Sequence, residues 1–169
     1  MGYVHDTHMA QYIPPTAWHF ATATMTQVAG QVAGTIALHR AANNQTSVIT
    51  IPVMIPSNSI ALKGAYLTSI EVDYENTTGA ISTSMTPVVY SVARGADTAV
   101  AVVSTLASTY TPVQANLLLQ DQVKCTVTLT TPVWVDNDVY ILVQFSLIAG
   151  GGGSTQEFYA AVANFTLRV

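Results

Sequence analysis

Charged side chains are scarce in this sequence of 169 residues, because only 8% of the residues are Asp, Glu, Lys or Arg. An average soluble domain carries about 25%. Only five residues are Lys or Arg and the net charge is −4, which argues against a protein that tracks nucleic-acid phosphates. The hydrophobic fraction of 50% argues against a disordered chain.

Cysteine and long apolar runs are scarce as well. Cys125 is the only cysteine, so neither an intramolecular disulfide nor a cysteine-based metal site can form. The longest strongly apolar run, residues 139–148, is far shorter than the ~18–20 residues of a membrane-spanning helix. No basic and then apolar leader opens the chain, so we expect a soluble protein that is made in the cytosol and makes no membrane contact.

The few charges also bear on assembly. The polar residues are mostly Thr, Ser, Asn and Gln, which would give a lone domain a poorly soluble surface. Burial of this surface against other copies removes the difficulty, so we expect a homo-oligomer or a lattice. A small neutral monomer coated with Thr is the alternative.

Residues 1–17 differ from the rest of the chain. They show neither strict alternation nor helical spacing, and Pro14-Pro15 imposes an extended backbone that lacks ladder donors. We expect residues 1–17 to be an extended arm that lies on a neighbouring copy, and residues 18–169 to be a single domain. A frayed terminus is the alternative. The apolar, aromatic and histidine side chains expected to make contacts between copies are Tyr3, His5, His8, Tyr12, Ile13, Trp18 and Phe20.

Alternation of apolar and polar residues predicts strands along most of the remaining chain. The predicted strands are 18–24, 35–40, 47–55, 65–75, 82–94, 117–130, 139–148 and 158–169, and 99–108 is a strand or a short helix. Pro52 indicates an edge position or a bulge, and Thr131-Pro132 is expected to end the strand before it. Such a series without an amphipathic helix predicts an all-β, antiparallel two-sheet sandwich, and its length favours a jelly roll of about eight strands.

One predicted strand carries an acidic ladder. In residues 65–75, Tyr66, Ile70, Val72 and Tyr74 share one face, and the acidic side chains share the other. Like charges along one face need water or a partner, and we expect a neighbour's Lys or Arg to face them. The acidic side chains are Glu71, Asp73 and Glu75.

No motif in the sequence indicates catalysis, a cofactor or a metal. The segment 150–153 is Gly-rich but lacks the Gly-Lys-Ser/Thr ending of a phosphate loop. Cys125 lies on an apolar strand face, where a thiol is inert. His5 and His8 could share a metal, and Asp136 with Asp138 could bind calcium, but polar packing and turn formation explain these pairs more simply. We therefore predict a protein that is not an enzyme.

Several segments resemble β-rich proteins of environmental sequence that are similar to components of phages or virus-like particles. These segments are Tyr12-Ile13-Pro14-Pro15, 51–59 (IPVMIPSNS), 62–67 (LKGAYL), 131–138 (TPVWVDND) and 164–167 (NFTL). The resemblance implies a jelly-roll structural subunit, trimeric, with no catalytic residues.

Three functions follow as expectations. The first is a self-associating virion subunit (capsid, head decoration or fibre) that is assembled in the host cytoplasm from copies of itself and other virion proteins. The second is an extracellular filament or surface-layer subunit whose arm is donated as a strand to a neighbour's sheet. The third is a carbohydrate-binding module, which needs exposed aromatic side chains; Tyr66 and Tyr74 share a face but Ile70 and Val72 lie between them.

Overall fold

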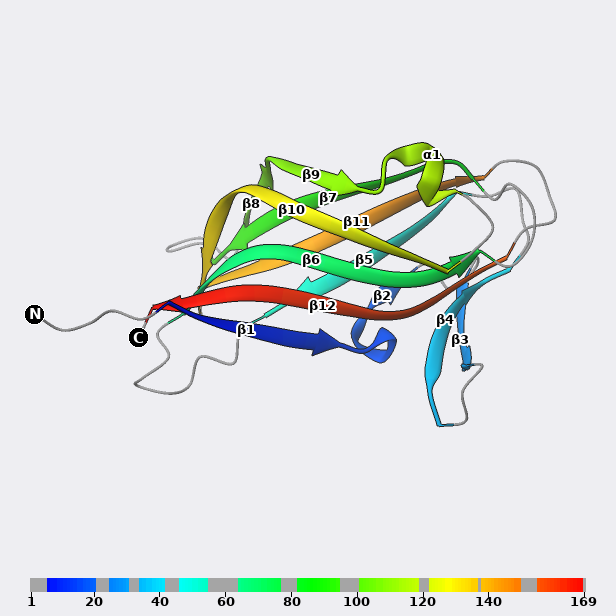
Figure 1. Ribbon diagram of the computed structural model, residues 1–169, viewed down its shortest axis with the longest axis horizontal. Helices are drawn as coiled ribbons and strands as arrows, with labels where there is room; N and C mark the ends of the chain where they lie inside the picture. The colour runs from blue at the N-terminus through cyan, green and yellow to red at the C-terminus, as the bar shows by residue number, and fades with distance from the viewer. Residues whose placement is uncertain are drawn as a thin grey trace, which may run out of the picture.

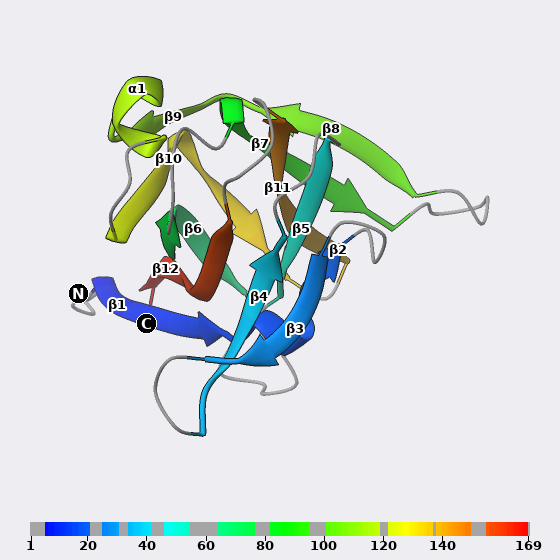
Figure 2. The ribbon, with the colours of Figure 1, turned by 90° about the vertical axis from the view of Figure 1, so that its right-hand side faces the viewer.

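Two antiparallel β-sheets lie face to face in this protein (Figures 1 and 2). The computed structural model describes residues 6–20, 25–30, 34–41, 46–54, 64–76, 82–94, 101–118, 122–136, 138–149 and 155–168. In Figure 1, β1, β12, β6 and β10 lie in front of β5, β11 and β7. The predicted all-β sandwich of two antiparallel sheets is confirmed.

The larger sheet has the strand order β3-β4-β12-β6-β10-β9, and β1 also pairs with β12. One edge of β12 is covered by β6, while the other edge is shared by β4, at residues 156–158, and β1, at residues 161–168. The strands of this sheet are β1 (Asp6–Ile13), β3 (Met25–Ala29), β4 (Ile36–Arg40), β6 (Ala65–Asn76), β9 (Ser108–Thr111), β10 (Gln122–Val135) and β12 (Gln156–Arg168).

The smaller sheet has the strand order β2-β5-β11-β7-β8. Two short helical turns lie outside the sheets, the 3-10 helix η1 (Pro15–Ala17) and the α-helix α1 (Gln114–Leu117). The strands of this sheet are β2 (His19–Phe20), β5 (Ser47–Val53), β7 (Ser82–Ala93), β8 (Val102–Leu106) and β11 (Val139–Ala149).

The core fills the space between the sheets with the apolar half of each alternating pattern. On β11, alternation predicts Val139, Ile141, Val143, Phe145 and Leu147 on the inward face; the last four are buried and Val139 is half-buried. Aromatic rings join the two ends of the chain, because Phe158 stacks on Tyr74 with ring centroids 5.3 Å apart and meets the edge of Trp18 at 6.3 Å. Each Å² of apolar surface that these side chains bury stabilises the fold by about 25 cal/mol, and this burial is the main stabilising contribution.

The N-terminal segment does not lie as an arm on a neighbour, which corrects the prediction for residues 6–17. β1 pairs with β12 of its own chain over eight residues, and the side chains of Ile13 and Trp18 are only 5% and 4% exposed. Trp18 Nε1 donates a hydrogen bond of 3.2 Å to the Ile13 carbonyl oxygen, which holds the turn through η1. The alternation on β1 is weak because Gln11 separates the inward residues Met9 and Ile13.

Two further predictions about strands are corrected by irregular pairing. β10 continues through Thr131-Pro132 to Val135, because a register shift between Thr128 and Val133 accommodates the proline. The same shift interrupts the alternation of β6 between Leu67 and Ser69. As a result, Tyr66 points outward while Ile70 points into the core. Pro52 fits the predicted edge position, because β2 pairs only with Ile49 and Thr50 of β5.

Candidate functional site

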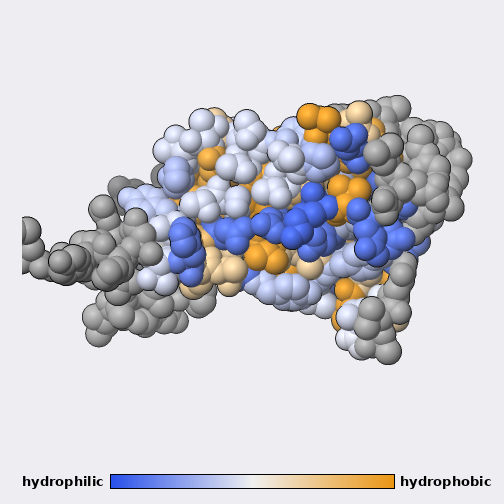
Figure 3. Space-filling model, viewed as in Figure 1, coloured by the Kyte–Doolittle hydropathy of each residue, from blue (hydrophilic) through white to orange (hydrophobic). Residues whose placement is uncertain are grey.

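The outer face of the larger sheet gathers four of the nine acidic residues, and we call it the acidic face. Figure 3 shows a hydrophilic strip across it. Lys124 of β10 lies on the same face, with its Nζ 2.9 Å from Glu71 Oε2. The acidic ladder therefore meets a lysine of its own chain, which corrects the expectation that a neighbour supplies the cation to Glu71. The four acidic side chains are Glu71, Asp73, Glu75 and Glu157.

Two carboxylates of the acidic face lie directly opposite each other on paired strands. Glu75 of β6 is the register partner of Glu157 on β12. The hydroxyl of Tyr159 lies between them and donates to Glu75 Oε2 at 2.7 Å, while Glu157 Oε2 lies 3.2 Å away. His39 Nδ1 approaches Glu157 Oε1 at 3.5 Å on the other side. Burial, and then the two carboxylates, raise the pKa of Tyr159, so this hydroxyl remains a donor at neutral pH.

Of the metal candidates named from the sequence, His8, Asp136 and Asp138 lie in the part of the chain that the structure describes. In the part of the chain that the structure describes, no three or more His, Cys, Asp or Glu side chains are placed to hold a metal ion. Asp136 instead forms a turn, because its Oδ1 accepts the backbone N–H groups of Asp138 at 2.9 Å and Val139 at 3.1 Å. His5 and the Gly-rich segment 150–153 lie outside the described residues.

Cys125 is buried, as predicted, on the inward face of β10. Burial raises the pKa of its thiol to about 12, so the thiolate is not populated at neutral pH. The only cysteine of the chain is therefore unsuited to nucleophilic chemistry.

The residues predicted to contact other copies divide between the surface and the core. His8 and Tyr12 point outward from β1 and share the acidic face with Glu71, Asp73 and Glu75. Ile13 and Trp18 belong to the protein's own core instead, which corrects their assignment as surface anchors. Phe20 is half-buried against that core, and Tyr3 lies outside the described residues.

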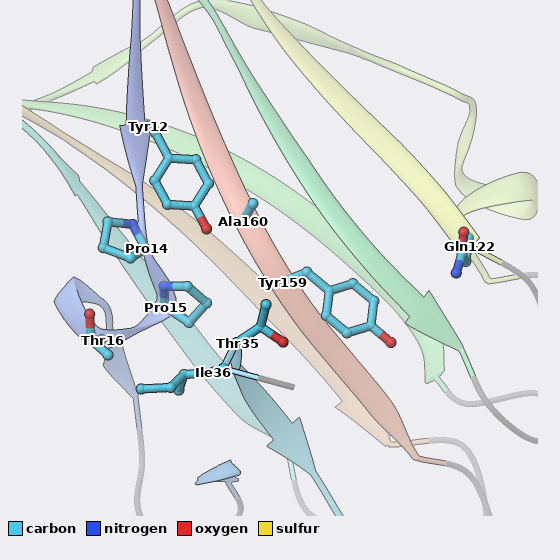
Figure 4. Close-up of a pocket in the computed structure, with 10 residues that line it drawn as sticks. Tyr12, Pro14, Pro15, Thr16, Thr35, Ile36, Gln122, Tyr159 and Ala160 are labelled. Atoms are coloured by element: carbon cyan, nitrogen blue, oxygen red, sulfur yellow. The ribbon is translucent and has the colours of Figure 1, made fainter. Parts of the chain in front are cut away.

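A groove opens on the larger sheet where β1 ends and β4 begins (Figure 4). It exists because β4 pairs with β12 up to Phe158 and β1 pairs from Ala161 onward, so neither strand pairs with Tyr159 or Ala160. The groove has a volume of about 560 Å³. Most of its wall is apolar or aromatic, and its lining includes Tyr12, Pro14, Pro15, Ile36, Gln122 and Tyr159.

The smaller sheet differs from the larger one in that its strands carry no charged side chain: none of the five contains an Asp, Glu, Lys or Arg. Cross-strand partners share a face, so the outward residues form rows across β5, β11, β7 and β8. We call this surface the uncharged face, and its two most apolar rows are Tyr140–Val92–Val103 and Pro52–Leu142–Tyr90–Thr105.

Several side chains of the uncharged face are open to solvent. Tyr140 is 40% exposed and Val103 is 58% exposed, while Val92 between them is almost fully covered. The composition of strands 47–55, 82–94 and 139–148 already contained this signal, since none but the last residue of 82–94 is charged. Sequence reasoning missed it because it did not place these strands in one sheet.

Comparisons with known proteins do not assign the chain to a family. No protein-family model matches the chain, and no curated protein is similar to it in sequence. Among the described residues, no helix is long and apolar enough to cross a membrane. The functional argument therefore rests on the strand order and on the chemistry of the two outer faces.

Proposed function

We propose that this chain is a self-associating jelly-roll subunit with a structural role in a phage or virus-like particle, and that it is not an enzyme. The observation that carries the proposal is the uncharged face, a whole sheet without Asp, Glu, Lys or Arg that displays Tyr, Val, Leu and Pro side chains outward. Its partners are other copies, in a trimer or a larger assembly, together with other virion proteins. Its location is the virion, assembled in the host cytoplasm.

The strand order supports the jelly-roll part of the proposal. Eight strands, β4 to β8 and β10 to β12, pair in nested fashion: first with last, second with seventh, third with sixth and fourth with fifth. These pairs are β4 with β12, β5 with β11, β6 with β10, and β7 with β8. A chain folded double and then wrapped into two sheets has this order, which builds viral capsid domains, lectins and cupins. Because one fold hosts unrelated functions, the choice among these classes rests on the chemistry of the surfaces.

The uncharged face supports the self-association part. The buried centre of a protein interface is depleted of charged residues and enriched in aromatic ones. The exposed Tyr140 and Val103, together with the partly exposed Leu142 and Tyr90, have this composition. A soluble monomer seldom leaves such a surface exposed to water, because covering it stabilises an assembly by the hydrophobic effect.

The experiment is a mass measurement by light scattering, combined with negative-stain electron microscopy. We expect the wild-type protein to exceed the 17.9 kDa of one chain. Tyr140→Lys places a charge on the uncharged face and should shift the mass toward 17.9 kDa with an unchanged circular dichroism spectrum. Thr128→Lys, an exposed change on the larger sheet, is the matched control and should assemble normally. A wild-type monomer at all concentrations would contradict the proposal.

A second candidate function, carbohydrate binding, is favoured by the groove beside Tyr12. Sugars stack on aromatic rings and bond to amides and carboxylates, and here Tyr12 and Tyr159 line the wall with Gln122. Tyr66 and Tyr74 do not form an exposed aromatic row, because Tyr74 is only 1% exposed. A glycan array tests this function: binding that Tyr12→Ala abolishes and Tyr66→Ala leaves intact would support it, and an array without signal would exclude the glycans it displays.

The filament alternative loses its main support within the described residues. A donated strand must leave its own sheet open, but residues 6–13 pair with β12 of the same chain. Long polymers in the micrographs would restore that alternative, whereas discrete particles favour a virion subunit.

A further inference from the structure

The outermost strand of the smaller sheet, β8, has an open edge. β7 pairs with β8 along one side, from Val89–Leu106 to Ala93–Val102, and no described strand pairs along the other. Four of its five residues are exposed, with Val102 and Val103 at 59% and 58%. An open edge presents unpaired backbone N–H and C=O groups, and the structure that satisfies such a row is another β-strand.

Natural proteins usually carry features that prevent pairing at such an edge, and the described residues of β8 lack the commonest of them. Lysine, inward-pointing charge, proline and bulges are the common devices that prevent a second strand from adding to a sheet edge. Residues 101–111 contain no charged residue and no proline, and the pairing of β8 with β7 is regular over all five residues. The described residues of this edge therefore carry no charge, proline or bulge that opposes the addition of a strand.

We propose that β8 pairs antiparallel with β8 of a second copy across a two-fold axis at Ser104. This inference rests on the proposed self-association and names one of its contacts. A register centred on Ser104 pairs the whole of Val102–Leu106 with itself. It places Val102 opposite Leu106 and Val103 opposite Thr105, and such apolar and β-branched pairs are favourable across strands.

A second copy fits this edge for two reasons. The edge is neutral, so two copies of it do not repel each other, and a two-fold contact satisfies both open edges at once, so that it can join copies in pairs within a larger assembly. Pairing also joins the two smaller sheets into one, which brings the uncharged faces of both copies side by side near Val103 and Val92. Contact along the edge and burial of the uncharged face then support each other.

Cysteine cross-linking tests the contact and its register. Directly opposite residues of antiparallel strands have Cα atoms ~4.5–5.5 Å apart, which is within the range that a disulfide bridges. Ser104→Cys should form a covalent dimer under mild oxidation with oxidised glutathione, because Ser104 lies opposite its own copy. Val103→Cys mixed with Thr105→Cys should cross-link more than either variant alone. The native Cys125 is buried and does not compete.

Controls separate this inference from the proposed function. Thr128→Cys, exposed on the larger sheet, should remain non-covalent, and circular dichroism checks that each variant folds. An oligomeric wild type in which none of the three β8 positions cross-links would overturn the β8 contact and leave self-association standing. A monomeric wild type would overturn both. In unmodified protein, dilution from oligomer to monomer should also speed amide hydrogen exchange in residues 102–106, and unchanged exchange would count against the contact.

Discussion

A buried polar cluster beside α1 allows a quantitative prediction about stability. The carbonyl oxygen of Leu117 accepts two hydrogen bonds, from Tyr74 Oη at 2.7 Å and from Asn76 Nδ2 at 3.0 Å. Gln156 Nε2 donates in turn to Asn76 Oδ1 at 3.1 Å. These side chains fix the helical turn to the larger sheet, and all four residues are buried.

The two donors to Leu117 should be non-additive. Tyr74→Phe removes one of them while Asn76 still satisfies the carbonyl, so we expect a loss of about 1 kcal/mol, as for a typical hydrogen bond. Asn76→Ala removes the other donor and also the acceptor of the buried Gln156 amide, so we expect a loss of about 2–3 kcal/mol. The double variant leaves the buried carbonyl without either side-chain donor, which adds a further ~1–3 kcal/mol beyond the sum.

Urea unfolding followed by tryptophan fluorescence, to which the buried Trp18 contributes, measures this cycle. The protein concentration is held fixed because self-association affects apparent stability. Phe145→Leu is a suitable reference, since it changes the core on β11 without removing a hydrogen-bonding group, and it should add to Tyr74→Phe without coupling. Single losses that sum to the double loss within about 0.5 kcal/mol would refute the shared role of the Leu117 carbonyl.

Two further predictions concern a glycine and the response to alkali. Gly64 has a φ of 149°, and a Cβ there would lie 2.6 Å from the ring of Trp134 and from the Val135 carbonyl oxygen. Gly64→Ala should therefore lower the melting temperature, and an unchanged melting temperature would disprove that close contact. In the folded protein, burial raises the pKa of Cys125 from an ordinary 9.0 to about 12. Above pH 9 the unfolded chain therefore releases a proton that the folded chain keeps, so the free energy of unfolding falls as pH rises from about 9 to about 12. In urea titrations, the free energy of unfolding of Cys125→Ala should not decline between about pH 9 and 10. The decline above pH 10 should remain, because it comes from the raised pKa values of Tyr74 and Tyr159. An unaltered decline below pH 10 would contradict the assignment to Cys125.

The sequence predicts a strand well wherever alternation is strict. Residues 139–148 alternate without interruption, and the strand and its inward face are found as predicted. β1 was missed as a strand because its inward face carries Gln11 between Met9 and Ile13, so its hydrophobic pattern is too weak to detect. What makes β1 a strand is the open edge of β12, a partner that is about 155 residues away in the chain and that local pattern does not reveal.

Faces and surfaces are harder to predict than strands. Strict alternation places Tyr66 on the same face as Ile70, but the register shift between β6 and β10 reverses the face between them. The outward aromatic pair of Tyr66 and Trp134, with ring centroids 5.0 Å apart, was unpredictable for the same reason. A bulge depends on the pairing of two strands, and a pattern of apolar residues along one strand carries little information about it.

The distribution of charge between the sheets favours one orientation in an assembly. Glu75 and Glu157 already face each other across two strands, and their repulsion grows as water is removed and the effective dielectric falls. The Tyr159 hydroxyl and His39 lie beside this pair, but both belong to the same chain, and a like-charged copy laid on this face would add further negative charge, which is unfavourable. Burial of the smaller sheet carries no such penalty, because its strands contain no charge to desolvate. We therefore expect copies to meet through the smaller sheet and the β8 edge, with the acidic face and its groove directed to solvent.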